Sequence, residues 1–331
     1  MDSVNQSMKD HERPEYFERS CQVLHPDWII QPRIPTVGQF YSGLGGWAIA
    51  IYTLATIVLM VIGAEYGWLV YHFIKNVPSS RLVSTIWVNS LYLVAAIMAF
   101  SSVVVPQASQ FVWGFYQIYL TMVMCHFVSI TMDWYGGGSE MVTLIGHQNP
   151  INLRVPPACC CYCFIPKDTP LSERKILALR GCVYQMPYVQ TAMIFITFLL
   201  LLSGTTRTGN LSPDDPYLYT QLIIQVSFFT GIWALFSLVG ITLQYEKLSG
   251  HHYRTKALLL KVMMGLTNLQ TLIIDALVNY NVIRCVNEEI SGFAMGCVIK
   301  SSIVMIESIV FGSLTLRLYQ KHDDVSDYGH L

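Results

Sequence analysis

Seven apolar segments, each long enough to cross a lipid bilayer, constrain this chain more than any other feature. A spanning helix needs about 20 predominantly apolar residues. Barrel strands would be about ten residues long, with alternating apolar and polar positions. The pattern therefore predicts an all-α integral membrane protein, a bundle of seven transmembrane helices. The segments lie at roughly 47–73, 83–105, 110–133, 182–203, 217–243, 257–283 and 291–315.

The composition agrees with a membrane protein and excludes several other classes. Of the 331 residues, 53% are hydrophobic and only 12% are charged, whereas about a quarter of the residues of a soluble domain are charged. The net charge of −1 gives no sign of a nucleic-acid partner. The first twenty residues are polar and charged, so we expect no cleavable signal peptide and expect the internal spans to direct insertion.

Basic residues indicate the orientation, because loops on the cytosolic side are enriched in lysine and arginine. The opposite short loops carry only Arg207 and Arg284. The N-terminus is therefore predicted outside the cell and the C-terminus in the cytosol. The basic residues on the predicted cytosolic side are Lys75, Arg81, Arg154, Lys167, Arg174, Lys175, Arg180, Lys247, Arg254, Lys256, Arg317 and Lys321.

These features divide the chain into three parts. Residues 1–45 are predicted to form an irregular extracellular tail, because Pro14, Pro26, Pro32 and Pro35 interrupt any helix. Residues 46–316 form the seven-helix domain, with a cytosolic loop at 135–181. Residues 317–331 form a cytosolic tail.

Four cysteines stand close together in the loop 135–181, beside the membrane. They are Cys159, Cys160, Cys161 and Cys163. Cysteines next to a membrane span are common acceptors of thioester-linked acyl chains, and the cytosol disfavours disulfides. Zinc is the weaker alternative, because structural zinc sites use two separated ligand pairs. We expect lipidation here, and no cofactor or metal.

The predicted outer face carries two kinds of candidate modification. Asn5 and Asn210 each begin a glycosylation sequon. Cys21 and Cys285 also fall outside, so a disulfide between them is a candidate. Both are expectations from short patterns.

Polar residues in the sixth and seventh spans are the strongest candidates for a substrate pathway. Asn268, Thr271, Asp275 and Asn279 recur at steps of three or four residues, which places them on one helix face. An ionised group in the middle of a span costs about 3 kcal/mol, so it normally faces the protein interior or a wet cavity. Two interpretations stay open: a substrate path, or structural pairs between helices. The substrate-pathway candidates are Asn268, Thr271, Asp275, Lys300, Glu307, Gln185 and Gln225.

Three other polar positions in the spans favour structural roles. Glu65 lies near the inner end of the first span and can reach the interface. His126 in the third span is more often a hydrogen-bonded core residue than a titrating one. Pro187 in the fourth span frees a backbone carbonyl and allows a kink.

Several functions that are common among proteins with seven spans are excluded because their motifs are missing. At the end of the third span Asp133 is followed by Trp134, whereas a G-protein-coupled receptor carries an arginine there. The chain has no phosphate-binding loop of the type used by ATP-driven pumps. We expect no enzyme activity. The remaining alternatives are a carrier, and a receptor or scaffold that binds a lipid without moving it.

The chain resembles the organic solute transporter alpha subunits, which are bile-acid and steroid carriers. The resemblance covers residues 47–328 or so, and in the family a glycine pair and an acidic residue end the third span, ahead of a cysteine run. Here the run is interrupted by Tyr162, and Gln107 and Gln190 stand where the family carries basic residues, so the charge of the substrate is left open. The matching stretches are Tyr135-Gly136-Gly137-Gly138-Ser139-Glu140, Pro156-Pro157-Ala158-Cys159, Ser172-Glu173-Arg174-Lys175, Leu266-Thr267-Asn268-Leu269-Gln270 and Ile306-Glu307.

The resemblance implies facilitated transport that needs neither ATP nor sodium. It also implies a heteromeric complex with a small single-span beta subunit, and steroid-like, bile-acid-like or other amphipathic organic solutes as substrates. We expect a multi-pass plasma-membrane protein that folds through the endoplasmic reticulum.

Overall fold

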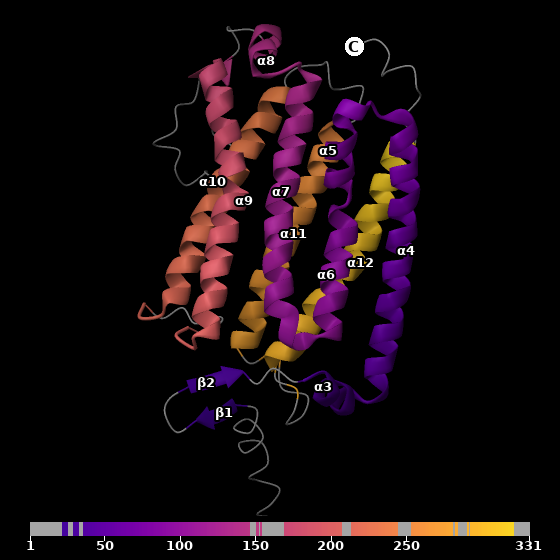
Figure 1. Ribbon diagram of the computed structural model, residues 1–331, viewed down its shortest axis with the longest axis vertical. Coiled ribbons are helices and arrows are strands. Elements are labelled where there is room, and N and C mark those ends of the chain that lie inside the picture. The colour runs from indigo at the N-terminus through magenta and orange to yellow at the C-terminus, as the bar shows by residue number, and fades with distance from the viewer. Residues whose placement is uncertain are drawn as a thin grey trace, which may run out of the picture. The chain divides into compact units, whose positions relative to one another are not determined.

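The predicted membrane spans are confirmed by the computed structural model, in which seven helices are long and apolar enough to cross a membrane (Figure 1). The structure describes residues 22–25, 29–32, 36–145, 150–151, 153, 169–206, 213–243, 253–280, 282–283, 290 and 292–320. The orientation of the termini stays a prediction. The spanning segments are Gly46–Asn76 (α4), Ser79–Val104 (α5, Ser79–Asn89, and α6, Leu91–Val104), Pro106–Trp134 (η1, Pro106–Ala108, and α7, Ser109–Trp134), Glu173–Leu202 (α9), Pro216–Leu243 (α10), Tyr253–Asn279 (α11) and Gly292–Gln320 (α12).

Two helices differ from the apolar pattern in their details. Helix α9 begins at Glu173, whereas the apolar pattern predicts a start near 182. The first turns of the helix carry Arg174, Lys175 and Arg180. These basic residues lower the local hydropathy but do not prevent a helix. The second span is divided at Ser90 into α5 and α6. Neither feature changes the number of spans.

Regular structure also lies between and before the spans. Within residues 1–45, where the prolines predict irregular chain, β1 (Gln22–His25) pairs with β2 (Ile29–Pro32) in an antiparallel hairpin, and α3 (Val37–Leu44) follows. Helix α3 begins with a capping box between Thr36 and Gln39. The loop 135–181 contains α8 (Gly138–Ile145) and a second hairpin of β3 (Pro150–Ile151) and β4 (Thr169–Pro170).

The chain forms two compact units. Unit 1 comprises residues 1–64, 93–113 and 262–311, and unit 2 comprises 65–92, 114–261 and 312–331. In unit 1, Phe40 of α3 packs against Ile290 and against Ala294 and Val298 of α12. The Tyr52 hydroxyl donates to the Val103 carbonyl near the end of α6, at 3.1 Å.

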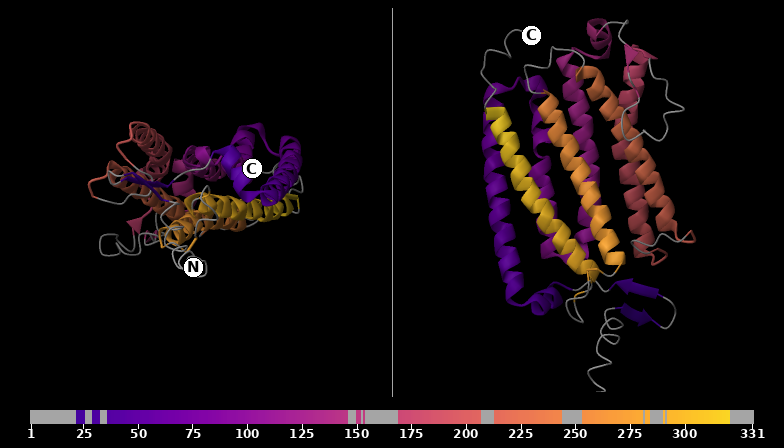
Figure 2. Two further views of the ribbon diagram at one scale, coloured as in Figure 1. Left: turned by 90° about the horizontal axis from the view of Figure 1, so that it is seen from below. Right: turned by 180° about the vertical axis from the view of Figure 1, so that it is seen from behind.

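In unit 2, α9 and α10 run antiparallel and side by side (Figure 2). The fully buried Met186 of α9 lies against Gly231 of α10, where an added Cβ would fall 2.5 Å from Met186 Cγ. Farther along, Thr197 Oγ1 donates to Thr220 Oγ1 at 3.2 Å. Small residues let helix backbones approach closely in membranes, and Gly231 serves this purpose within the chain itself.

Glycines are required in the turn from α7 to α8. Gly136 and Gly137 have φ angles of +79° and +116°, a region that residues with a Cβ rarely adopt. The preceding Tyr135 is buried, and its hydroxyl donates to the carbonyl of Thr242 near the end of α10, at 3.2 Å. The glycine turn therefore redirects the chain while Tyr135 fixes the end of α7 to α10.

Helix α9 continues through Pro187, and a neighbouring helix supplies the missing hydrogen bond. Proline has no N–H, so the carbonyl of Val183, four residues earlier, loses its intrahelical donor. The Cys125 thiol of α7 donates to this carbonyl at 3.7 Å. Thiols are weak donors, and this contact links α7 to α9 at the proline.

Candidate functional site

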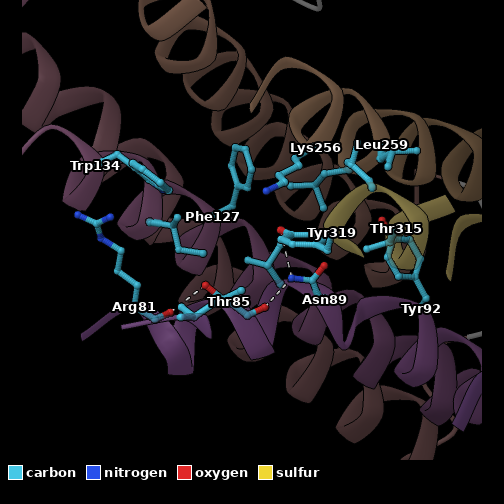
Figure 3. Close-up of a pocket in the computed structure, with 15 residues that line it drawn as sticks. Arg81, Thr85, Asn89, Tyr92, Phe127, Trp134, Lys256, Leu259, Thr315 and Tyr319 are labelled. Carbon is cyan, nitrogen blue, oxygen red and sulfur yellow. Dashed lines mark hydrogen bonds between the residues drawn. The ribbon is translucent and has the colours of Figure 1, made fainter. Parts of the chain in front are cut away.

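Unit 2 contains a cavity at the ends of α5, α7, α11 and α12 (Figure 3). Apolar and aromatic side chains form most of its wall, and the charged and polar groups come from different helices. A small number of polar groups in an apolar cavity is typical of a binding site for an organic ligand. The lining includes Arg81, Thr85 and Asn89 of α5, Tyr92 of α6, Phe127 and Trp134 of α7, Lys256 and Leu259 of α11, and Thr315 and Tyr319 of α12.

Two cations of the cavity lie on aromatic ring faces. Lys256 Nζ is 3.9 Å from the centroid of the Tyr319 ring, and Arg81 Cζ is 4.6 Å from that of Trp134. Arg81 Nη2 also donates to the carbonyl of Asp133, at 3.1 Å. Contacts between cations and rings contribute about 0.5–2 kcal/mol each. They hold both charges at the wall of the cavity.

Asn89 organises the polar part of the wall. It is buried, and its Nδ2 donates to the Thr85 carbonyl at 2.8 Å and to the Tyr319 hydroxyl at 3.4 Å (Figure 3). The Tyr319 ring meets the Phe73 ring edge-on, with centroids 4.9 Å apart. Asn89 and Phe73 therefore both hold Tyr319, whose ring also contacts Lys256.

The cavity is narrow. Its volume is about 70 Å³, whereas sites for drug-sized ligands have roughly 300–1,000 Å³. It has room for a few water molecules but not for a steroid nucleus. A larger solute would require Lys256 or Arg81 to move away from its ring.

The predicted pathway residues of α11 and α12 lie in unit 1 and form two pairs. Lys300 is half-buried, with Nζ 4.1 Å from the centroid of the Trp113 ring, and it interacts electrostatically with Asp275. The Asp275 side chain is exposed on the surface of the chain. The inward placement of these charges stays a prediction. The half-buried Glu307 accepts a hydrogen bond from Gln270 Nε2.

The other pathway candidates are dispersed. Asn268 Nδ2 donates to the Met264 carbonyl and Thr271 Oγ1 to the Thr267 carbonyl, each at 2.9 Å within α11. In unit 2, Gln185 is half-buried and Gln225 is exposed, and neither lines the cavity. The structure therefore brings Asp275 near Lys300 and Glu307 to Gln270, but does not unite the seven candidates in one site.

The structural roles expected for two polar residues agree with their contacts. Glu65 Oε1 of α4 accepts a hydrogen bond from Ser313 of α12 at 2.7 Å. His126 Nδ1 of α7 lies 3.2 Å from Ser84 Oγ of α5. Each contact joins two spanning helices of unit 2.

Several expected modification sites lie outside the described residues. These are the cysteines Cys159, Cys160, Cys161 and Cys163, the sequons at Asn5 and Asn210, and the pair Cys21 and Cys285. Within the described ranges, no group of three or more metal-ligating side chains is present.

The cavity residues were missed by the sequence patterns because each has another interpretation there. Arg81 and Lys256 count only as basic residues at span ends, and Asn89 is one of several polar residues in an apolar span. Tyr319 falls at the predicted start of the tail. Only their convergence from separate helices distinguishes them.

Seven apolar helices define a multi-pass membrane protein, and in unit 2 it has a cavity with charged groups. The family model described as Organic solute transporter Ostalpha matches residues 47–324. The chain belongs to this family.

Curated relatives agree over most of the chain. It is 23% identical over 276 residues to the organic solute transporter subunit alpha of Danio rerio, covering 82% of each protein. It is 23% identical over 286 residues to the subunit of the same name from Leucoraja erinaceus, covering 86% of this chain and 79% of the relative. It is 23% identical over 261 residues to the organic solute transporter alpha-like protein 3 of Caenorhabditis elegans, covering 76% of this chain and 71% of the relative. No solved structure matches the chain.

Proposed function

We propose that this chain is the alpha subunit of a heteromeric, facilitative carrier for steroid-like, bile-acid-like or other amphipathic organic solutes. Transport would be bidirectional and independent of ATP and sodium, at the plasma membrane. The single observation that carries the proposal is the cavity of unit 2. Apolar and aromatic walls suit a hydrophobic ring system, and Arg81 and Lys256 suit a negative group at one end.

The cavity also suggests how such a solute is held. An anionic group would contact Lys256 Nζ after this side chain leaves the Tyr319 ring, and the ring would then be free to contact the apolar part of the solute. The exchange gives up the contact with the ring, which contributes about 0.5–2 kcal/mol. Charge-assisted hydrogen bonds to an anion contribute about 1.5–3 kcal/mol.

The test is tracer flux of a sulfated steroid and of its neutral parent through the carrier with its partner in vesicles. Lys256→Gln removes the cation from the cavity and should raise KM for the sulfated steroid about tenfold or more. The neutral parent should be much less affected. The matched control is Lys75→Gln, because Lys75 also lies on a tyrosine ring, 4.3 Å from that of Tyr71, but outside the cavity.

Equal effects of Lys256→Gln and Lys75→Gln would reject the cavity as the solute site. Flux that is not saturable, or that runs in one direction only, would reject the carrier itself. Saturable binding without any flux would favour the alternative of a receptor or scaffold that holds a lipid.

The charged residues of unit 1 are proposed as a second part of the route, with Asp275, Lys300 and Glu307 as its polar groups and Asn268 and Thr271 beside them. The electrostatic interaction between Asp275 and Lys300 supports this, and the exposed Asp275 would need a wet or protein-covered surface there. Glu307→Gln should lower flux while the protein remains at the cell surface. Normal flux, or loss of surface protein, would make Glu307 a structural residue.

A single-span beta subunit is proposed as the partner, and the word subunit in the names of the relatives supports it. Gly231 and Gly240 of α10 are small residues of the kind that admit a further helix. Met186 already occupies the space beside Gly231, whereas nothing lies within 4 Å of a Cβ added at Gly240. Full transport by the purified chain alone in liposomes would contradict a required partner.

Acylation of the cysteine run is also proposed, at two or more of its four cysteines. The hairpin of β3 and β4 closes the base of this loop, and the Trp233 indole donates to the Leu153 carbonyl at 3.0 Å. Trp233 lies ten residues from the end of α10, or about 15 Å along the helix, so Leu153 lies beside the membrane span. A hydroxylamine-sensitive mass shift on the intact protein is expected, and its absence would reject acylation.

A further inference from the structure

Three parallel rings lie between α5 and α7 in unit 2, away from the cavity. The Trp87 ring of α5 stacks on Tyr119 of α7 with centroids 5.2 Å apart and an angle of 27°. It also stacks on His126 of α7, again at 5.2 Å, with an angle of 17°. Tyr119 and His126 are seven residues apart, about 10 Å along the helix. The three rings therefore form a strip along the groove between the two helices.

The strip faces outward. Trp87, Tyr119 and His126 are half-buried, and their neighbours Val83 and Met122 are 60% and 40% exposed. Because both helices are membrane spans, the groove is in contact with lipid rather than water.

His126 leaves one polar atom at this surface. Its Nδ1 lies 3.2 Å from Ser84 Oγ, and its Nε2 has no hydrogen-bond partner in the part of the chain that the structure describes. The Ser84 hydroxyl can donate to Nδ1 or accept from it, so Nε2 is a donor in one tautomer and an acceptor in the other. In the hydrocarbon layer no water is available to pair with it, and an unsatisfied polar group there is costly.

We propose that this groove binds a membrane sterol, with the sterol hydroxyl on His126 Nε2 and the sterol rings against Trp87 and Tyr119. A hydroxyl can donate or accept, so it satisfies either tautomer, whereas a carboxylate or phosphate only accepts and needs a proton on Nε2. A rigid ring system loses less conformational entropy than a flexible acyl chain when it packs against the strip. The sterol would stay bound in this groove as a structural lipid and would not be the transported solute.

The direction of the sterol follows from the position of His126. This residue lies eight residues before the end of α7 at Trp134, or about 12 Å along the helix. Tyr119 lies farther toward the middle of the span. The hydroxyl would therefore point to the membrane face at the Trp134 end and the rings toward the bilayer centre, as for a sterol of that leaflet. With the predicted orientation, that is the cytosolic leaflet.

The experiment is photolabelling of the purified full chain in lipid nanodiscs with a diazirine analogue of cholesterol, followed by peptide mapping. Saturable labelling is expected on the α5 and α7 segments around Trp87 and Met122. Unlabelled cholesterol should compete, and cholestane, which has the rings without the oxygen, should compete about five- to tenfold less well, as expected for the loss of one hydrogen bond. This comparison uses the unaltered protein.

A matched pair of variants locates the hydrogen bond. His126→Phe keeps a ring in the stack and removes both nitrogens, and it should lower the affinity for the probe about five- to tenfold. His72→Phe makes the same change at the half-buried His72 of α4, which contacts Asn76 and is outside the strip, and it should leave labelling unchanged. Labelling elsewhere, equal competition by cholestane, or an unchanged affinity of His126→Phe would each overturn the proposal.

Discussion

The contact between Gly231 of α10 and Met186 of α9 gives a quantitative prediction for Gly231→Ala. An added Cβ would fall 2.5 Å from Met186 Cγ and 2.6 Å from Cε, and closer still to Sδ. Met186 is fully buried, so it has little room to withdraw. Overpacking of this kind costs about 1–3 kcal/mol. Alanine in a helix is favoured over glycine by about 1 kcal/mol, which offsets part of the cost.

Gly240→Ala is the matched control, because it lies on the same helix with nothing within 4 Å of an added Cβ. It gains the helix propensity without the clash. The two variants should therefore differ in stability by about 1–3 kcal/mol, or roughly 2–10 °C in the thermal midpoint of the purified protein in detergent.

A second substitution tests the cause of this difference. As a single change, Met186→Ala should lower the stability of the protein. It also removes the side chain that a Cβ at position 231 would contact. The double variant of Met186→Ala and Gly231→Ala should thus lose less stability than the sum of the two single changes. Equal midpoints for Gly231→Ala and Gly240→Ala, or strict additivity in the double variant, would refute the reasoning.

Three further predictions concern the turn, the proline and the topology. Gly137→Ala should destabilise by about 1–2 kcal/mol in the same assay, because φ is +116° there; stability equal to that of Gly240→Ala would contradict this. Cys125→Ala should lower the free energy of unfolding by about 1 kcal/mol, because it removes the donor to the Val183 carbonyl. This loss should be smaller in a background with Pro187→Ala, which restores a backbone N–H in α9. A loss of the same size in that background would show that the thiol does not act through this hydrogen bond. A cysteine introduced at Ser212 in a cysteine-free background should react with an impermeant thiol reagent on intact cells, and reaction only after permeabilisation would reverse the predicted orientation.

The spans could be predicted because membrane insertion depends on a local property, the length of apolar sequence. The predicted bounds of the helices are wrong where a helix forms in a polar segment or where an apolar segment contains a turn. The basic residues before 182 hide the first turns of α9, and the single turn at Ser90 leaves no composition signal. Helix α3 could have been expected from Thr36 and Gln39, whose capping box is visible in the sequence.

The cavity could not be predicted, because its residues are distant in the sequence and ordinary in their local context. Lys256 and Tyr319 meet only after α11 and α12 are packed in unit 2. The polar side chain of Gln225 favours a pathway residue in the sequence; in the structure it is exposed and does not line the cavity, so its role stays a prediction. Periodicity identifies a helix face, but the packing decides what covers that face.

The break between α5 and α6 and the position of the cavity have a common explanation. Irregular backbone at membrane depth is tolerated only where protein buries it or where it lines a cavity. The break follows Asn89, which lies about 15 Å from the start of the span at Ser79 and lines the cavity. Its side chain bonds to the Thr85 carbonyl, and Ser90 Oγ bonds to the Trp87 carbonyl at 2.8 Å.

Side chains at the break thus satisfy carbonyls of the last turn of α5, and Asn89 also reaches Tyr319. Interrupted helices near the middle of the bilayer hold substrates in many transporters. In the proposed carrier, we expect a change at Tyr319, when Lys256 leaves its ring for a solute, to reach Asn89 through their hydrogen bond, directly before the junction at Ser90. The α5–α6 junction is therefore where we expect the narrow cavity to widen.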